Sequence, residues 1–398
     1  MKVPRLPLTW RFTVAVWVLV LQRGSLAWRP SARSSSRQYT KLFQTKFRGR
    51  GLPYVETFEE QTTRRLWETN PFSIAKSIAN TILQEGNEVP RDPLLAKVDV
   101  VGHQTNSSGY EPLFQTVYDS PPYPSKFAGL VAQNATNVKK LNFLLELAYR
   151  GEDFCGWQTQ PNNDQLPSVQ ETIEGWLQEL EGGNVDVRVC GRTDAGVHGI
   201  GQVARYRSRI SDLSAAHVHE HLAEISRSST RGLRCLRVVP VTKSFHPSFG
   251  AVCRAYVYLI DTDHWSGMDP SRVVIYLNEQ LQSLQGQALD YIALSYGRLK
   301  TQTSICTLLH AQAHLVRESK SGKQAICVEL VGDRFLRRMV RMLVENSLRI
   351  AVGRGARSEG LLLQHLASRD RRSSGNAAPA DGLIFVGATF ENQVWPQS

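Results

Sequence analysis

The apolar residues from about Lys139 onwards follow an order of strand and helix periods that occurs twice. In the first round, segments with period-two alternation flank two segments with helical spacing. The six segments span residues 141–149, 168–181, 185–189, 200–206, 213–225 and 233–241. They predict the order strand, helix, strand, strand, helix, strand, which is a split β-α-β arrangement. Ser168 and Glu171 indicate a capping box at the start of the first helix.

The same order returns after residue 249. Strands are predicted at 252–260, 308–316, 324–331 and 383–390, with helices around 277–284 and at 335–352. The last helix is expected to end at Gly353. The fold class predicted is α+β, with two tandem ferredoxin-like (RRM-like) split β-α-β domains, antiparallel sheets and an active-site cleft between them. The two halves would span residues 139–248 and 249–398.

A polar loop interrupts the central strand pair of the first half. Three glycines stand close together in it, around Arg192, Asp194 and His198. Glycines so placed allow turn conformations that other residues avoid. A carboxylate on such a loop can be a nucleophile, a metal ligand or a turn residue, and the spacing alone favours the turn.

The loop sequence Gly-Arg-Thr-Asp-Ala-Gly-Val-His at 191–198 resembles the signature of the TruA-type tRNA pseudouridine synthases. Further blocks that resemble this family follow its order at 149–158, 168–170, 245–249, 254–258, 335–341 and 378–383. The resemblance implies an isomerase that converts uridine to pseudouridine in tRNA, in the anticodon arm at positions 38 to 40. It implies Asp194 as the nucleophile, neither a cofactor nor a metal, and a homodimer.

The resemblance also assigns the remaining site residues. Tyr256 would stack on the base, and Arg341 would pair with Asp194 and keep it ionised. The catalytic set is therefore Asp194, Tyr256 and Arg341. The expected substrate-binding residues are Arg192, His198, Phe245, His246, Arg254, Arg337 and Arg338.

Four arginines extend this assignment. Arg334, Arg337, Arg338 and Arg341 follow the spacing i, i+3, i+4, i+7, so a helix over 335–352 would place them on one face. Leu336, Met339, Val340 and Leu343 would then face the core. We expect the outer arginines of this face to bind RNA phosphates.

Two residues depart from the family pattern. Ser248 stands where an arginine is usual, and Arg150 stands where an aspartate is usual.

A rival interpretation is a zinc peptidase, because His217, Glu220 and His221 fit the H-x-x-E-H pattern on a helix. A catalytically inactive RNA-binding protein of the same fold is a further alternative.

The charge distribution locates the basic residues. The formal net charge is +11, but residues 1–50 hold eleven Lys or Arg and no acid. The rest of the chain then has 36 basic and 36 acidic groups. RNA affinity must therefore come from local clusters of Lys and Arg.

The six scattered cysteines indicate neither a disulfide framework nor a zinc site, which favours a reducing compartment.

The chain begins with a two-part leader. Residues 1–27 resemble a signal peptide, and 28–50 have the basic, acid-free, Ser-rich composition of a transit peptide. Together they resemble the bipartite leaders of secondary plastids, with mitochondrial import or secretion as alternatives. No stable membrane association is expected after leader removal. Residues 51–138 are predicted to be an extension that is largely linker, with a short helix at 72–83.

Overall fold

A computed structural model describes residues 57–84, 98–100, 141–159, 165–299, 301–318, 321–354 and 360–390. The predicted leader, at 1–50, lies outside these residues. None of the described helices is long and apolar enough to cross a membrane.

The first half has the predicted split β-α-β order. Its elements are β2 (Asn142–Tyr149), η2 (Gly151–Asp153), α6 (Val169–Glu181), β3 (Val187–Val189), β4 (His198–Arg207), α7 (Ala215–Ser228) and β5 (Leu233–Val241). In the sheet they follow β5-β2-β4-β3, with every pair antiparallel. The predicted capping box is present, because Ser168 accepts from the Glu171 amide and the Glu171 carboxylate accepts from the Ser168 amide. The prediction for this half is confirmed.

The second half repeats the arrangement with additions. Its elements are β6 (Ala251–Asp261), α8 (Pro270–Gln282), β7 (Ala288–Asp290), η3 (Ile292–Leu294), β8 (Ile305–Glu318), β9 (Gln324–Gly332), α9 (Met339–Arg354), α10 (Leu361–Ser368), η5 (Arg371–Ser373) and β10 (Leu383–Phe390). The four long strands follow the order β8-β9-β6-β10 and pair antiparallel. This half therefore has the same topology as the first.

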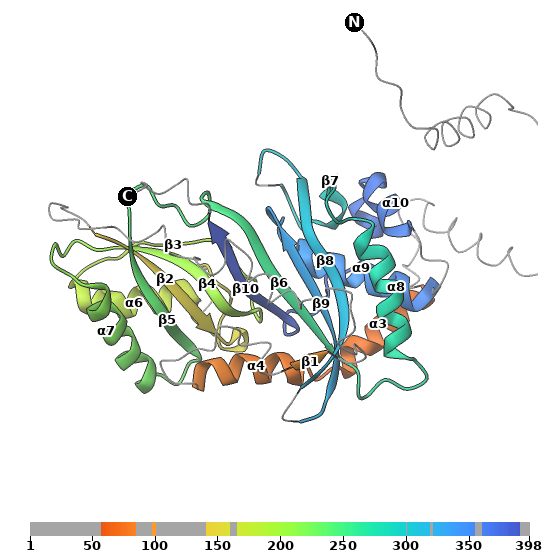
Figure 1. Ribbon diagram of the computed structural model, residues 1–398, viewed down its shortest axis with the longest axis horizontal. Coiled ribbons are helices and arrows are strands. Elements are labelled where there is room, and N and C mark those ends of the chain that lie inside the picture. Colours follow the sequence, from red (N-terminus) through yellow and green to blue (C-terminus); the bar gives the residue numbers. More distant parts are fainter. Residues whose placement is uncertain are drawn as a thin grey trace, which may run out of the picture. The chain divides into compact units, whose positions relative to one another are not determined.

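The two halves share one ten-stranded sheet of order β1-β8-β9-β6-β10-β4-β2-β5, in which β3 pairs with β4 and β7 with β8 (Figure 1). The short strand β1 (Val98–Val100) pairs with β8. At the seam between the halves, β10 pairs parallel with β4 through Ile384–His198 and Phe385–Gly199. Further along β4, the same edge pairs with β3 instead. The loop that joins β3 to β4 therefore lies at the seam.

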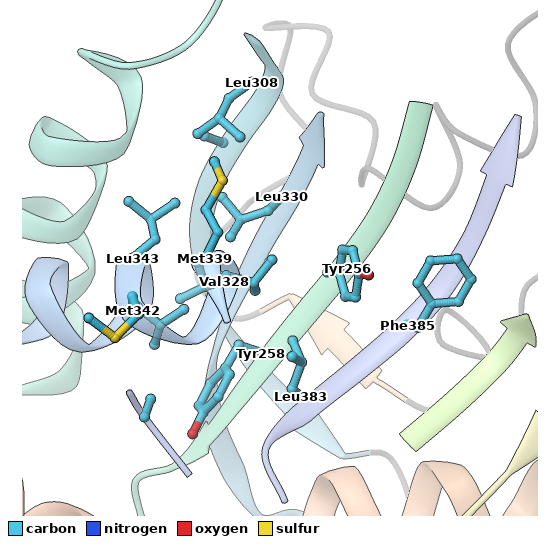
Figure 2. Packing of buried hydrophobic residues seen from close by; sticks show 14 of the residues in the cluster. Tyr256, Tyr258, Leu308, Val328, Leu330, Met339, Met342, Leu343, Leu383 and Phe385 are labelled. Atoms are coloured by element: carbon cyan, nitrogen blue, oxygen red, sulfur yellow. The ribbon is translucent and has the colours of Figure 1, made fainter. Parts of the chain in front are cut away.

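Alternate residues of β6 face opposite sides of the sheet. Tyr256 and Tyr258 belong to the large core that includes residues of α8 and α9, and Figure 2 shows them beside Phe385 and Leu383 of β10. Ala255, Val257 and Leu259 belong to a second core on the other face.

Two helices precede this body, and we call them the N-terminal brace: α3 (Phe58–Thr69) and α4 (Ser73–Gln84). The helix predicted at 72–83 is thus confirmed, whereas the sequence did not predict α3. Ile74, Ala75 and Ile78 of α4 are buried in the second core, with residues of β2, β4, β6 and β10. The helix α4 therefore covers the seam on the face opposite α8 and α9.

The helix α3 packs against α9. The Trp67 indole Nε1 and the Thr63 hydroxyl both donate to the Glu345 carboxylate, at 2.5 Å and 3.1 Å. Burial raises the pKa of Glu345. The Arg349 guanidinium bonds Glu60 at 2.9 Å. The brace therefore contacts the same helix that carries Arg341.

Gly353 does not end α9, which continues to Arg354. A Cβ atom at Gly353 would lie 2.0 Å from Cγ of Glu59 on α3. The prediction of a glycine helix end was wrong. This glycine instead allows α3 to approach α9 closely.

Candidate active site at the seam

The loop at 190–197 is held by the segment that follows β2. The Trp157 amide donates to the Thr193 carbonyl at 3.0 Å, and Gly156 forms an isolated bridge with Asp194. The Tyr149 hydroxyl bonds the Thr193 hydroxyl at 2.9 Å. The loop therefore packs on the segment 149–158, which explains why this block accompanies the loop in the sequence.

Two glycines allow the loop to pack closely on this segment. Gly196 has φ +83°, in the region that favours glycine. A Cβ at Gly151 would lie 2.3 Å from the Gly196 carbonyl oxygen, so the two backbones touch directly. The predicted glycine turn is therefore present at Gly196. It turns the chain immediately after Asp194 and fixes the position of the carboxylate.

Arg341 of α9 lies against Asp194. Its Nη1 donates to Asp194 Oδ2 at 3.0 Å, and its Nε donates to the Ala378 carbonyl at 2.6 Å. The Arg341 side chain is 13% exposed and that of Asp194 is 27% exposed. The pair joins the two halves, since Asp194 precedes β4 and Arg341 belongs to the second half. Asp194 is thus paired on one side and accessible on the other.

The predicted arginine face on one helix is wrong. The helix α9 begins at Met339, and Arg338 has φ +59°, a left-handed conformation that cannot continue an α-helix. Packing explains the difference: Phe335 lies edge-on to Tyr256 with ring centroids 5.1 Å apart, which holds the chain before α9 in a turn. The apolar part of the prediction is confirmed, because all four of its members are buried: Leu336, Met339, Val340 and Leu343.

The four arginines consequently have different surroundings. Arg334 donates to the Thr303 carbonyl at 2.7 Å. Arg337 is exposed. Arg338 lies near the loop at 190–197, where its Nε is 3.7 Å from Asp194 Oδ2. Asp194 is therefore approached by two guanidinium groups, of which the sequence indicated only one.

Tyr256 lies next to this loop and is 8% exposed. Its ring makes edge contacts with Phe335 and Phe385, with centroids 5.1 Å and 5.0 Å away. Burial raises the pKa of Tyr256 well above its usual range, and the nearby Asp194 charge acts in the same direction. The hydroxyl is therefore a neutral group, and the ring forms part of the apolar wall beside Asp194.

Three further predicted substrate-binding residues differ in their exposure to solvent. Arg192 is exposed on the loop, two residues before Asp194. His198 is 1% exposed, and its Nδ1 accepts from the Gly151 amide at 3.1 Å. Phe245 is also buried, in contact with Phe390. Burial gives His198 and Phe245 a packing role, and a direct contact with RNA stays a prediction.

Arg254 and His246 hold the loop between β5 and β6. Arg254 donates to the carbonyls of Ser248 and Asp333, at 2.5 Å and 2.7 Å. The His246 Nδ1 accepts from the amides of Ser248 and Phe249, each at 3.2 Å. Ser248, where the family usually has an arginine, takes part in these hydrogen bonds through its backbone amide and carbonyl. The predicted RNA contacts of Arg254 and His246 remain predictions.

Arg150, the second departure, has a structural partner outside the matched blocks. It bonds both carboxylate oxygens of Asp153, and its Nη1 donates to Asn80 of α4 at 3.0 Å. This substitution thus connects the body to the N-terminal brace.

The zinc-peptidase pattern has no support in the geometry of α7. The His221 Nε2 bonds the Trp176 carbonyl at 2.8 Å, while His217 and Glu220 are exposed. Across the described ranges, no group of three His, Cys, Asp or Glu side chains comes together as a metal site.

Comparisons with known proteins bear on this site. The family model described as tRNA pseudouridine synthase matches residues 284–391. The tRNA pseudouridine synthase A of Francisella tularensis subsp. holarctica strain LVS is 30% identical over 253 residues, covering 63% of this chain and 94% of the relative. This chain belongs to the TruA-type tRNA pseudouridine synthase family.

The enzyme of the same name from Francisella tularensis subsp. tularensis strain SCHU S4 is 29% identical over 252 residues, with the same coverage. A solved chain of a Cbf5-Nop10-Gar1 complex aligns with 53% of this chain and 45% of its own length, at a TM-score of 0.24 and 11% identity. That superposition is too loose to support an argument. Membership of the TruA-type family places the chain among the RNA-modifying isomerases.

Proposed function

We propose that this protein converts uridine to pseudouridine in tRNA and that Asp194 is the nucleophile. The observation that carries the proposal is the placement of Asp194 at the seam, hydrogen-bonded to Arg341 at 3.0 Å and still 27% exposed. A carboxylate in this position combines a fixed geometry with access for a substrate.

The reaction is an isomerisation, so it requires no external oxidant or reductant. The bond from the ribose C1′ to N1 of the base breaks, and a bond from C1′ to C5 forms. The proton on C5 is lost and N1 acquires a proton, so atoms and charge balance. Arg341 would orient the Asp194 carboxylate during the attack, and Tyr256 would supply an apolar surface for the base.

Arg192 would enter the RNA helix when the target base leaves its stack. It is exposed on the same loop as Asp194, which suits a side chain that replaces a displaced base. Arg192→Ala would then lower the reaction rate on folded tRNA more than on an unstructured RNA carrying the same uridine.

The proposed substrate is the anticodon arm, at positions 38 to 40, as the family resemblance implies. The test is pseudouridine mapping of unmodified tRNA incubated with the purified protein. Modification confined to these positions supports the proposal. Modification at other tRNA positions would refute the anticodon-arm assignment, and modification of another RNA class alone would refute tRNA as the substrate.

A homodimer is proposed on the same resemblance. Light scattering of the purified protein is the measurement, and we expect a mass of two chains. A mass of one chain at the concentrations that support turnover would contradict the proposal.

The proposed compartment is the plastid, on the composition of residues 1–50. Residues 1–50 fused to a fluorescent reporter should label the plastid. Trp28 is the aromatic residue that directly follows the signal-peptide-like segment 1–27, and Trp28→Ala should leave the reporter outside the plastid. Secretion or mitochondrial import of the intact fusion would contradict this assignment.

A further inference from the structure

Two guanidinium groups meet at Asp194, but only one forms a hydrogen bond with it. Arg341 donates to Oδ2 at 3.0 Å, whereas the Arg338 Nε lies 3.7 Å from the same atom. Within the described part of the chain, this Nε is enclosed and lacks a hydrogen-bond partner. An enclosed N–H without an acceptor is unfavourable, so other contacts must hold Arg338 in this position.

The Tyr296 ring contacts two guanidinium groups, that of Arg338 and, at 5.2 Å from Cζ to the ring centroid, that of Arg337. The Arg338 Cζ is 4.0 Å from the centroid of the Tyr296 ring, within the range of a cation–π contact. The Tyr296 amide donates to the Arg337 carbonyl at 3.0 Å, which ties the two segments together. The ring is nevertheless 47% exposed, so it is not a core residue.

The Arg338 backbone is fixed as well. Its φ of +59° is costly for a residue with a side chain. Its carbonyl accepts from the Met342 amide at 2.9 Å, in the first turn of α9. Backbone and guanidinium are thus both held, and the Arg338 Nε lies 3.7 Å from Asp194 Oδ2.

We propose that Tyr296 is a positioning residue that holds Arg338 beside Asp194, so that the Arg338 guanidinium, whose side chain is 32% exposed, donates to an oxygen of the target nucleotide. The acceptor arrives with the uridine that reaches Asp194. This inference rests on the proposed function, because it requires Asp194 to be the reacting group. It assigns roles to two residues, one of which no sequence pattern indicated.

The test compares single-turnover rates at saturating tRNA, together with tRNA affinity, for variants of the full-length protein. Tyr296→Leu removes the aromatic face, and we expect the rate to fall about three- to tenfold, with affinity changed less than about twofold. Tyr296→Phe keeps the aromatic face and should retain the wild-type rate. Tyr276→Leu, the same type of change on α8, is the matched control.

A double-mutant cycle separates positioning from general packing. If Tyr296 acts through Arg338, Tyr296→Leu should have no further effect on the rate once Arg338→Gln is present. Full additivity, or a Tyr296→Phe variant as slow as Tyr296→Leu, would overturn the proposal. Asp194→Asn is measured in the same assay, and its turnover tests the proposed function. If Asp194→Asn is inactive while Tyr296→Leu keeps the wild-type rate, only the inference about Tyr296 is overturned.

Discussion

Gly201 of β4 offers a direct test of how the two halves meet. A Cβ atom at this position would lie 2.1 Å from the Val386 carbonyl oxygen of β10. Ordinary contacts begin at 3.4 Å, so Gly201→Ala must push the two strands apart by about 1 Å in a region packed like a crystal. The obstacle is backbone, so no rotation of a side chain relieves it.

We expect Gly201→Ala to lower the free energy of unfolding by about 1–3 kcal/mol, because overpacking of this kind outweighs the entropic gain from losing a glycine. The apparent melting temperature should fall by about 2–8 °C. The assay is thermal unfolding followed by circular dichroism, with turnover measured on the same samples. Displacement at the seam should also lower turnover, since Asp194 and Arg341 belong to different halves.

Gly175→Ala on α6 is the matched control, because nothing lies within 4 Å of a Cβ at that position. Alanine is favoured over glycine within a helix by about 0.5–1 kcal/mol, so this variant should be at least as stable as the wild type. If Gly201→Ala matched Gly175→Ala in stability, the close pairing of β4 with β10 would be refuted.

Three further outcomes follow from the contacts. Arg341→Ala should abolish most turnover while tRNA affinity stays near the wild-type value. Arg337→Ala should instead weaken tRNA binding and reduce the slope of log affinity against log salt by about 0.7–0.9. If the two variants changed turnover and affinity to a similar extent, these separate roles would be contradicted. Trp67→Ala should destabilise the protein by about 2–4 kcal/mol in urea unfolding, and no change would mean that the N-terminal brace is dispensable. Burial lowers the pKa of both His198 and His365, so these two side chains bind more protons in the unfolded chain than in the folded one. The free energy of unfolding should therefore decline as the pH falls below about 6.5. An unchanged urea midpoint between pH 7 and 5.5 would contradict this prediction.

The strand and helix order could be predicted from the sequence because each element has its own apolar period. The limits of β5 and β10 were predicted correctly, and Ser168 marked the start of α6. The relation between the halves could not be predicted in this way. The parallel pairing of β10 with β4 depends on contacts between residues almost 200 positions apart, and no local pattern encodes it.

The limits of periodicity are clearest at the arginines before α9. A regular spacing predicted one helical face, but Phe335 packs against Tyr256 and Arg338 adopts a left-handed conformation. Long-range packing therefore overrides the local pattern and moves Arg338 towards Asp194. Tyr296 carries no sequence signal at all, since its role depends on a ring and a guanidinium that meet only in the folded chain.

The most direct test of the central claim is the release of tritium from tRNA labelled at C5 of its uridines, measured for the wild type and for Asp194→Asn. Formation of the new C1′–C5 bond expels the C5 hydrogen, so release reports the chemistry itself. We predict release by the wild type and none by Asp194→Asn, with tRNA affinity and melting temperature nearly unchanged. Sustained release by Asp194→Asn, shown to be free of deamidated protein, would contradict the assignment of Asp194 as the nucleophile.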